Sequence, residues 1–344
     1  MKAYVWEGPN RLRLEADYPD PVCGAGDAVL KVLSAGICST DAHIVSGRLD
    51  CGEPPAVLGH EICGEVLETG RDVVGFRAGD RVVVETSIGC GRCRPCHTGN
   101  KHLCREFREV GFPPVDGGYA QYVAVPAGCL RHIPSAVSND QGGILEASIC
   151  PFGAIYRQGM QMGSSVLVFG GGVAALSFIQ AVRCHSPRKV IVAARKDWQL
   201  ECARRFGADV TIDTSREDLD ARVMEETDGE GAELSIDATG APATIERMVG
   251  LTAKGGRCIL YGLPPDGADI AFPVKTMIFR QITVSGGTNN ELAWDPLIGL
   301  IASGRFNTAD MVTHRFAFDE LPEAMRLVEA RPQGLIKAVV HPWE

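Results

Sequence analysis

From about residue 164 onward, short apolar strands alternate with helical segments along the chain. The strand-like stretches are SVLVFG, KVIVAA, VTID, LSIDATG and RCILYG, and the helical stretches include DWQLECARRFG and APATIERMVGLTAKG. A strand, a helix and a second strand in this order form a βαβ unit, and successive units build a parallel, doubly wound sheet. This alternation restricts the second half of the chain to an α/β fold.

The first half of the chain has a different pattern. Short β-like runs, among them AYVWEG, DAVLKVLSAG and EICGEVLETG, are separated by Gly, Pro and Asp, which is typical of a twisted, mostly antiparallel domain. The segment after QITVSGG is too long for a cap, and we expect it to return to this domain. The predicted organisation is a β-rich catalytic domain over residues 1–149 and 289–344 and a nucleotide-binding domain over residues 150–288.

Composition and charge exclude several classes of protein. Hydrophobic residues make up 45% and charged residues 22% of the chain, which argues against disorder. The net charge of −9 repels nucleic acid and anionic lipid, so we expect neither as a partner. The N-terminus lacks the apolar segment of a signal peptide, and no apolar run reaches the roughly 20 residues of a membrane span. We therefore expect a cytoplasmic protein whose 13 cysteines are thiols or metal ligands.

A cluster of four cysteines lies in the stretch CGRCRPCHTGNKHLC. Its members are Cys90, Cys93, Cys96 and Cys104. The short gaps allow one loop to place four sulfur atoms around one ion, and zinc bound by four thiolates with no open position is a structural site. An iron–sulfur cluster also uses four thiolates, and four unrelated thiols are the third reading. The spacing favours a structural zinc lobe over residues 88–105.

A second group of metal-binding residue types lies elsewhere in the sequence. Cys38 is in GICSTDAH, His60 and Glu61 are in GHE, and Glu146 is in GGILEASIC. One cysteine, one histidine and one carboxylate leave a position open for water or a substrate oxygen, as a catalytic zinc requires. Taken singly, Cys38 reads as a small buried apolar residue and His60 as a hydrogen-bonded core histidine.

A glycine-rich turn follows the first strand of the α/β half. The residues from Gly170 through Gly172, Val173 and Ala174 to Ala175 fit the pattern G-x-G-x-x-A at the start of a helix. Glycines in such a turn let a pyrophosphate approach the helix N-terminus closely. An ordinary glycine turn is the alternative, but the strand before it and the helix after it favour a dinucleotide site.

The end of the next strand indicates which dinucleotide binds. NAD enzymes place an acidic residue there, about 20 residues after the glycines, to accept hydrogen bonds from the ribose 2′-hydroxyl. In this sequence the position is Ala194, followed by Arg195 and Lys196. Because no carboxylate repels a 2′-phosphate and two cations can bind it, the sequence favours NADP(H) over NAD(H). In the alternative, both cations are solvated and Asp197 reaches the ribose.

Taken together and in this order, GICSTDAH, GHE, the four-cysteine loop and the glycine-rich turn resemble the zinc-dependent medium-chain alcohol dehydrogenase family. The resemblance covers nearly the whole chain and is closest to the polyol (sorbitol-type), butanediol and threonine dehydrogenase branch. It implies a GroES-like catalytic domain, a Rossmann nucleotide-binding domain, two zinc ions per chain and a homodimer or homotetramer. Val173 departs from the family, which commonly has proline there.

The resemblance also implies the ligands of the catalytic zinc. Cys38 and His60 match the first two ligands, and Glu61 matches the third ligand in polyol-type members. Glu146 matches a residue that binds the ion directly or through its water. Which of the two glutamates coordinates the ion can change with the catalytic state, so we retain both.

Three residues of GICSTDAH match catalytic roles in the same family. Thr40 matches the hydroxyl that takes the substrate proton, and His43 matches the outer histidine that passes it to solvent by way of the cofactor ribose. Asp41 matches the acid that orients the ligating histidine, although a solvated or capping aspartate is its alternative. The residues that the resemblance places beside the nicotinamide are Thr239, Gly240, Tyr261, Gly262 and Leu263.

The substrate pocket is the part on which the resemblance says least. Sorbitol-type enzymes have an Arg-Tyr pair where this sequence has Asn289 and Asn290, which weakens an expectation of sorbitol itself. Neutral amides suit polar, neutral substrates, although both residues are also turn formers. We predict hydride transfer between the nicotinamide cofactor and a secondary alcohol or its ketone, such as a polyol, sugar or cyclitol-like compound. The alternatives are C=C or iminium reduction by the same fold and a non-catalytic nucleotide sensor.

Overall fold

The C-terminal segment of the chain returns to the sheet of the first half. In the computed structural model, which describes residues 1–344, strand β18 (Lys337–His341) pairs antiparallel with β3 (Asp27–Ile37). The chain divides into two units. Unit 1 comprises Met1–Ile149 and Trp294–Glu344, and unit 2 comprises Cys150–Ala293.

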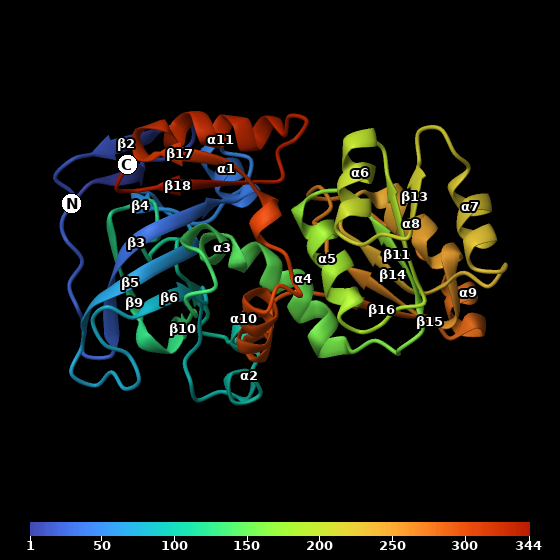
Figure 1. The fold of residues 1–344 in the computed structure, drawn as a ribbon, viewed down its shortest axis with the longest axis horizontal. Coiled ribbons are helices and arrows are strands. Elements are labelled where there is room, and N and C mark those ends of the chain that lie inside the picture. Colours follow the sequence, from blue (N-terminus) through green and yellow to red (C-terminus); the bar gives the residue numbers. More distant parts are fainter. The chain divides into compact units, whose positions relative to one another are not determined.

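Unit 1 is built on β-sheets, as the short β-like runs predict. Its main sheet has the strand order β10-β6-β5-β3-β18-β17, with β9 also paired to β3 (Figure 1). The other strands of this sheet are β5 (Glu61–Thr69), β6 (Arg81–Val84), β9 (Tyr122–Pro126), β10 (Leu130–His132) and β17 (Val312–Ala317). Along β9, buried residues alternate with half-buried ones, because successive side chains of a strand point to opposite faces.

Two smaller sheets complete the β-structure of unit 1. The first consists of β2 (Leu12–Glu15), β1 (Ala3–Trp6) and β4 (Ala56–Val57), and the second of β7 (Ser87–Ile88) and β8 (Arg108–Glu109). Strand β1 is buried throughout and contributes to one continuous hydrophobic core with β3, β5 and β9. The β-rich first domain predicted from the sequence agrees with this arrangement.

Helices connect and cover the sheets of unit 1. Helix α1 (Ser39–Val45) follows β3, and α11 (Leu321–Ala330) packs against α1, β17 and β18. The buried face of α11 consists of Leu321, Ala324, Met325 and Val328, a spacing typical of an amphipathic helix. The other helices are α2 (Arg94–His97), α3 (Asn139–Gly143), α4 (Leu145–Gln158), which continues into unit 2, and α10 (Trp294–Ala302).

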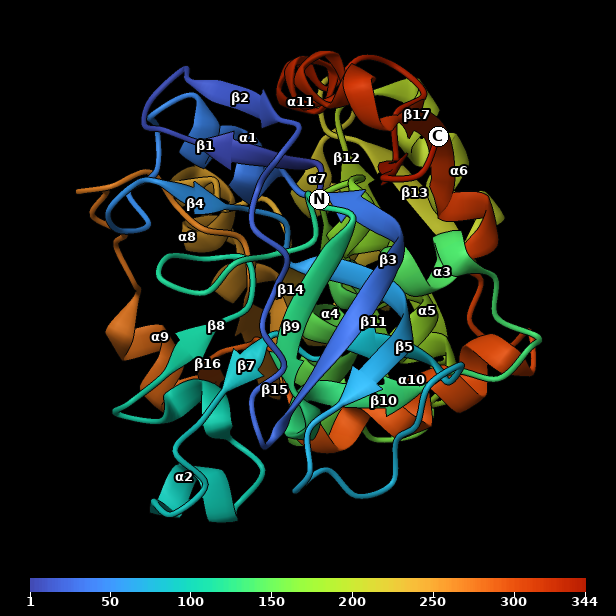
Figure 2. The same cartoon turned by 90° about the vertical axis from the view of Figure 1, so that its left-hand side faces the viewer.

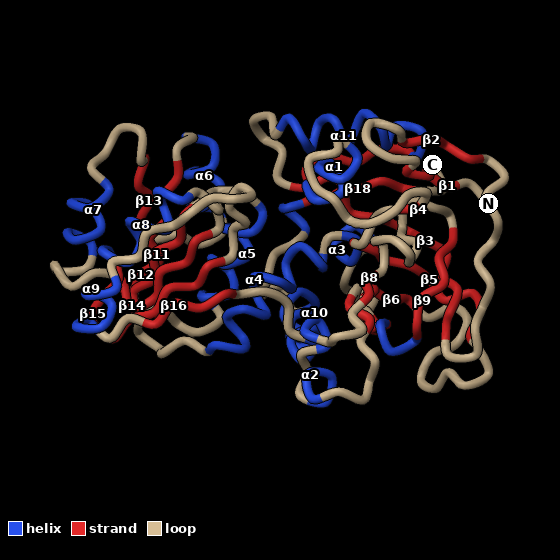
Figure 3. The backbone as a smooth tube through the Cα atoms, turned by 180° about the vertical axis from the view of Figure 1, so that it is seen from behind, coloured by secondary structure: helices blue, strands red, loops and turns tan.

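Unit 2 contains one six-stranded sheet in which every neighbouring pair is parallel. Its order is β13 (Val210–Asp213), β12 (Lys189–Ala194), β11 (Ser165–Phe169), β14 (Ala232–Asp237), β15 (Thr252–Leu260) and β16 (Thr283–Gly286). The helices that flank the strands in Figures 1 and 3 are α5 (Val173–Arg183), α6 (Asp197–Arg205), α7 (Leu219–Glu226), α8 (Pro242–Leu251) and α9 (Val274–Arg280). This is the doubly wound α/β fold that the alternating sequence pattern predicts.

The strand order of unit 2 determines where a ligand can bind. The chain leaves β11 toward β12 on one side, and β14 later pairs with the other side of β11. In doubly wound sheets, ligands bind at the carboxyl ends of the strands beside such a switch in order. The glycine-rich turn after β11 lies at this position.

The boundary near residue 289 differs slightly from the sequence expectation. Residues 289–293 lie in unit 2 rather than in the catalytic domain. The reason is close backbone packing, because a Cβ on Gly153 would lie only 2.7 Å from the backbone nitrogen of Asn290. None of the helices in either unit combines the length and apolar character needed to cross a bilayer.

Candidate active site

Helix α1 presents four of the predicted site residues. Cys38 caps its N-terminus, and the Cys38 sulfur accepts a hydrogen bond from the Thr40 backbone nitrogen at 3.5 Å. Asp41 lies in the first turn and is fully buried, whereas His43 lies in the last turn and is half-buried. An acidic residue is favourable in the first turn because the helix dipole is positive there. The helix therefore gathers a thiol, a hydroxyl and a carboxylate within one turn.

The GHE motif forms a glycine turn that enters a buried strand. Gly59 has a φ of +97°, and a Cβ there would lie 2.9 Å from the ring of Tyr119. Only glycine adopts this conformation without strain and leaves room for the ring. His60 follows directly, Glu61 is the first residue of β5, and both are buried.

A buried chain of hydrogen bonds holds the His60 ring. Nδ1 of His60 lies 3.2 Å from Asp41 Oδ1, and the Tyr119 hydroxyl donates to Asp41 Oδ2 at 2.7 Å. Burial opposes protonation of His60, but the Asp41 carboxylate outweighs it and raises the pKa of His60. Burial and the same carboxylate raise the pKa of Tyr119, so its hydroxyl stays a donor. A carboxylate on one ring nitrogen orients the other nitrogen as a metal ligand.

The Glu61 carboxylate is held from a distant part of the chain. Lys337, in β18, contacts Glu61 Oε1, and both side chains are buried. A Cβ on Gly36 would lie 2.0 Å from Glu61 Oε2, so the carboxylate occupies space that only glycine leaves open. Oε2 itself is buried without a hydrogen-bond partner in the protein. Such an oxygen is costly to bury, and binding to a cation would satisfy it.

The structure brings three of the predicted zinc ligands together. The sulfur of Cys38, a ring nitrogen of His60 and a carboxylate oxygen of Glu61 all lie within 4.8 Å of one another. These three residues, hereafter the trio, are the donor types that zinc selects, and they leave a fourth position open. Glu146, in the first turn of α4, is a neighbour of the trio rather than a member, with its Oε2 3.9 Å from His60 Nε2. The trio, with His60 and Glu61 buried and Cys38 half-buried, therefore fits a zinc ion.

His43 has the electrostatic environment of a neutral imidazole. Burial lowers the pKa of His43 first, the neighbouring Arg331 and Arg48 lower it further, and Glu329 acts in the opposite direction. The His43 ring is therefore uncharged at neutral pH and can accept a proton. Glu329 of α11 and Arg331, which caps the C-terminus of that helix, influence His43 because α11 packs against α1.

The predicted structural zinc lobe projects from the main sheet, with α2 at its tip (Figures 1 and 2). The four Sγ atoms of Cys90, Cys93, Cys96 and Cys104 all lie within 4.8 Å of one another. The backbone nitrogens of Cys90 and Glu106 donate to Cys104 Sγ at 3.3 Å each. The pKa of Cys90 is lowered to about 6, chiefly by a backbone hydrogen bond from Arg92. Four sulfurs at this spacing fit one zinc ion with four thiolates.

A buried carboxylate connects the lobe to the sheet of unit 1. Glu85, which is fully buried, lies 3.1 Å from Lys101 Nζ and 2.6 Å from Arg131 Nη2. Lys101 lies between the third and fourth cysteines of the lobe, and Arg131 is in β10. The two cations compensate the buried charge, so the lobe has a fixed attachment to the domain.

The glycine-rich turn of unit 2 has the conformation that a dinucleotide site requires. Gly170 has a φ of +118°, and Gly172 is the N-cap of α5, whose first residue is Val173. No side chain caps this helix, so its first backbone N–H groups are open to an anion. Val173 and Ala174 are half-buried and continue the helix without distortion, so the family's proline is not needed to start it.

The residues predicted beside the nicotinamide follow β14 and β15. They are Thr239, Gly240, Tyr261, Gly262 and Leu263. Asp237, at the end of β14, organises them, because its buried carboxylate accepts from the Thr239 hydroxyl at 2.6 Å. Its backbone oxygen accepts from the nitrogens of Tyr261 and Gly262, both at 3.1 Å. One residue thereby fixes both turns relative to each other.

The end of β12 carries exposed positive charge. Ala194 is the last residue of the strand and is buried, whereas Arg195 and Lys196 are exposed. The structure contains no ion pair to either cation. The carboxylate of Asp197, the alternative ribose ligand, is already engaged by the guanidinium of Arg216 at 3.1 and 3.0 Å.

The two asparagines considered for the substrate pocket are both buried in unit 2. Asn290 Oδ1 accepts from the Leu292 nitrogen at 2.9 Å, at the start of a 3₁₀ helix over Glu291–Ala293. Asn290 is therefore a turn former, which was the alternative reading. Asn289 Oδ1 is buried without a hydrogen-bond partner.

Sequence reasoning missed three residues that organise the site. Tyr119 orients Asp41, Lys337 holds Glu61, and Asp237 fixes the turns after β14 and β15. Asp237 could have been found, since an acidic residue ending an apolar strand is an unusual feature. The other two lie in no motif and become evident only in three dimensions.

Comparison with known proteins identifies the family. The model of the alcohol dehydrogenase GroES-like domain matches residues 24–135, and that of the zinc-binding dehydrogenase matches residues 172–303. L-threonine 3-dehydrogenase of Pyrococcus horikoshii is 34% identical over 335 residues, which cover 94% of this chain and 93% of that protein. Sorbitol dehydrogenase of Bacillus subtilis is 28% identical over 345 residues, which cover 99% and 97% of the two chains.

A solved structure has the same fold over the whole chain. It is a Sinorhizobium meliloti 1021 protein, described as a zinc-binding dehydrogenase bound to NADP, with a TM-score of 0.92, 30% identity and 99% coverage of both chains. The GroES-like and Rossmann domains predicted from the sequence are thereby confirmed. The chain belongs to the zinc-dependent medium-chain alcohol dehydrogenase family, in the branch of threonine, sorbitol and butanediol dehydrogenases, and is an oxidoreductase that acts on CH–OH groups.

Proposed function

We propose that this enzyme transfers hydride between NADP(H) and a secondary alcohol or its ketone, with one catalytic and one structural zinc ion per chain. The observation that carries the proposal is the trio, which directly adjoins Thr40 on α1. A structural role alone does not account for the unpartnered Oε2 of Glu61, a member of a zinc-type donor set.

The residues of unit 1 have separate roles at the catalytic centre. The trio would hold the ion, with Glu146 beside it. When bound, zinc lowers the pKa of a substrate hydroxyl or polarises a carbonyl, and the nicotinamide accepts or supplies the hydride. Asp41 keeps the proton on Nδ1 of His60, so that Nε2 carries the lone pair that a metal needs.

Proton transfer in this proposal uses Thr40 and His43. The Thr40 hydroxyl takes the proton of the substrate alcohol, or delivers one to a carbonyl in the reverse reaction. His43 then passes the proton toward solvent, for which a neutral imidazole is required. Its lowered pKa, caused first by burial, supports this role.

The preference for NADP(H) rests on the residues at the end of β12. Arg195 and Lys196 are exposed and unpaired, and Ala194 offers no carboxylate that would repel a 2′-phosphate. The engagement of Asp197 by Arg216 argues against Asp197 as a ribose ligand.

The substrate class follows from chemistry shared with the relatives. L-threonine and sorbitol, named for the two relatives, both carry secondary hydroxyl groups. We therefore infer a polar secondary alcohol, such as a polyol, sugar or cyclitol-like compound. The turn-forming role of Asn290 removes one of the two amides expected to contact it.

We also infer a homodimer or homotetramer. Helix α9 has no buried residue, and its Val274, Ile278 and Phe279 are 61%, 67% and 78% exposed. Strand β16 is an edge strand of the six-stranded sheet, with backbone groups available for pairing. Light scattering of the purified protein tests this inference, and a monomer at all concentrations would refute it.

A cofactor-linked absorbance screen tests the proposed function. A panel of secondary alcohols and ketones is assayed with both nicotinamide cofactors, and zinc is counted in the same samples. We expect turnover with NADP(H) and two zinc ions per chain. Cys38→Ser should lose turnover and one zinc ion, whereas Cys23→Ser, a control whose thiol donates to the carbonyls of Gly24 and Asp27, should retain both. Full activity of Cys38→Ser would refute the proposal.

A further inference from the structure

Arg216, in the turn after β13, lies between two carboxylates. Its guanidinium donates to both oxygens of Asp197 at 3.1 and 3.0 Å, and its Nε lies 3.2 Å from Asp213 Oδ2. The side chains of Arg216 and Asp197 are 68% and 70% exposed. An exposed ion pair of this kind contributes little to stability, so the arginine can exchange its partner at small cost.

Arg216 follows β13, at the edge of the six-stranded sheet formed by the carboxyl ends of its strands. Strands β12 and β13 are parallel neighbours, with Ala194 opposite Asp213. The Thr214 nitrogen donates to the Ala194 oxygen at 2.9 Å, which ties the turn after β13 to the end of β12. Arg216 therefore belongs to the same edge of the sheet as Arg195 and Lys196, at the carboxyl ends where doubly wound folds bind nucleotides.

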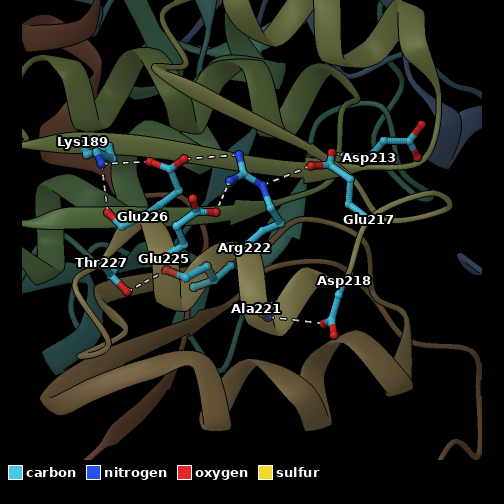
Figure 4. Close-up of polar contacts among 10 residues, drawn as sticks. Lys189, Asp213, Glu217, Asp218, Ala221, Arg222, Glu225, Glu226 and Thr227 are labelled. Carbon is cyan, nitrogen blue, oxygen red and sulfur yellow. Dashed lines mark hydrogen bonds and ion pairs between the residues drawn. The ribbon is translucent and has the colours of Figure 1, made fainter.

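A network of charged residues fixes the backbone that carries Arg216 (Figure 4). The Asp213 nitrogen donates to Glu217 Oε1 at 2.8 Å, and Arg222 Nε donates to Glu217 Oε2 at 3.1 Å. Arg222 also donates to Glu226, which accepts from Lys189 at the start of β12 at 2.9 Å. The network runs from one end of β12 to the end of β13. Arg216 touches it only through Nε, beside Asp213, so the two terminal nitrogens that hold Asp197 can exchange that carboxylate for another anion.

We propose that Arg216 is a specificity-determining residue that binds the 2′-phosphate of NADP(H) together with Arg195 and Lys196, and that Asp197 holds its guanidinium until the phosphate replaces it. The inference rests on the proposed use of NADP(H). A planar guanidinium that meets a carboxylate with two parallel hydrogen bonds meets a phosphate in the same way. The three cations at this edge of the sheet then outnumber its two carboxylates, those of Asp197 and Asp213.

The ion pair between Arg216 and Asp197 also explains why NAD(H) is not favoured. A ribose 2′-hydroxyl needs an acidic acceptor at the end of β12. Both oxygens of Asp197 are engaged by Arg216, and Asp213 Oδ1 accepts from the nitrogen and hydroxyl of Ser215 at 2.9 and 2.5 Å. The remaining oxygen, Asp213 Oδ2, has no hydrogen bond but is buried 3.2 Å from Arg216 Nε. Neither acid therefore offers an exposed, uncommitted oxygen to the hydroxyl, whereas a phosphate finds a donor in the guanidinium of Arg216.

The test compares dissociation constants of NADPH and NADH, measured by nicotinamide fluorescence. We expect Arg216→Gln to weaken NADPH binding by about tenfold or more, the loss of one charge-assisted contact, and to change NADH binding by less than about twofold. Arg188→Gln is the matched control, because Arg188 is also an exposed arginine paired with an exposed aspartate, Asp228, but precedes β12 at its opposite end. It should change neither constant.

The role of Asp197 gives a second variant with an effect of opposite sign. Asp197→Asn keeps the shape of the side chain but removes the charge that competes with the phosphate. We expect it to tighten NADPH binding and that of 2′,5′-ADP, used as a phosphate-bearing probe, and to leave binding of 5′-ADP unchanged.

The outcomes separate this inference from the proposed function. Equal losses of affinity for NADPH and NADH in Arg216→Gln would overturn the inference and show that Arg216 is only a structural partner of Asp197. If Arg195→Ala nevertheless weakens NADPH binding more than NADH binding, the proposed use of NADP(H) survives that result. If Arg195→Ala and Arg216→Gln each weaken the binding of both cofactors equally, both the inference and the proposed cofactor preference are wrong.

Discussion

Lys337 and Glu61 form a buried ion pair in unit 1, although 276 positions separate them in the sequence. They come from strands on opposite sides of β3, since β18 pairs with one edge of β3 and β5 with the other. Their side chains are 5% and 0% exposed. Because the ammonium engages Oε1, only Oε2 of Glu61 is left for a metal ion.

Removal of Lys337 should destabilise unit 1. We expect Lys337→Met to lower the free energy of unfolding of the zinc-free protein by about 3–5 kcal/mol, because the Glu61 charge would stay buried without a partner. Chemical denaturation with and without zinc measures the effect. Lys337→Arg, which keeps the charge, is the control and should lose less. An unchanged midpoint for zinc-free Lys337→Met would contradict the expectation.

Asp41 should control zinc affinity at the trio. An amide is a weaker acceptor for the Nδ1 proton of His60, so we expect Asp41→Asn to weaken zinc binding there by about 10- to 100-fold. Chelator competition followed by zinc counting measures this loss, with the ion at the cysteine quartet as an internal reference. Asp50→Asn, an exposed acid in the loop after α1, is the control. Equal zinc loss in both variants would rule out a specific role.

The cysteine lobe should affect stability rather than chemistry. We expect Cys93→Ser to lose one zinc ion per chain and to lower the melting temperature, because the free energy of structural zinc binding contributes to folding. Cys38→Ser should lose the other ion, with a smaller change in melting temperature. A Cys93→Ser protein with unchanged melting and full zinc content would show that the quartet holds no structural ion.

His341 should make stability depend on pH. Its pKa is raised, chiefly by the hydrogen bond from its Nε2 to Asp140 at 2.8 Å, and its other charged neighbour is Glu344. A histidine with a raised folded-state pKa stabilises the protein below its unfolded value of about 6.5, and this contribution disappears as pH rises through the folded-state pKa. The pKa of Asp140 is lowered, first by His341 itself and then by Arg315, so that carboxylate remains charged throughout this range.

The measurement compares melting temperatures of the native protein and His341→Gln across this pH range. We expect the native protein to be more stable by about 1 kcal/mol near pH 6, and the difference to shrink near pH 9. His314→Gln is the control, because His314, half-buried on β17, makes its side-chain hydrogen bond to the adjacent Thr313 and to no carboxylate. A difference that stays constant with pH would exclude the proposed titration.

Local patterns in the sequence determined the fold class and the donor types. The alternation of strands and helices predicted the parallel sheet, because hydrophobic periodicity and glycine turns act over a few residues. GICSTDAH, GHE and the four-cysteine loop predicted the metal ligands for the same reason, since each motif places its groups through short-range backbone geometry. The structure brings the atoms of both predicted ligand sets, apart from Glu146, within 4.8 Å.

Only the tertiary structure decided which partners surround those groups. Lys337 reaches Glu61 through the pairing of β18 with β3, and Tyr119 reaches Asp41 across 78 positions of sequence. The engagement of Asp197 by Arg216 likewise depends on β12 and β13 lying side by side. Such contacts leave no local signal, because burial and strand pairing set them, and these depend on parts of the chain that are distant in sequence.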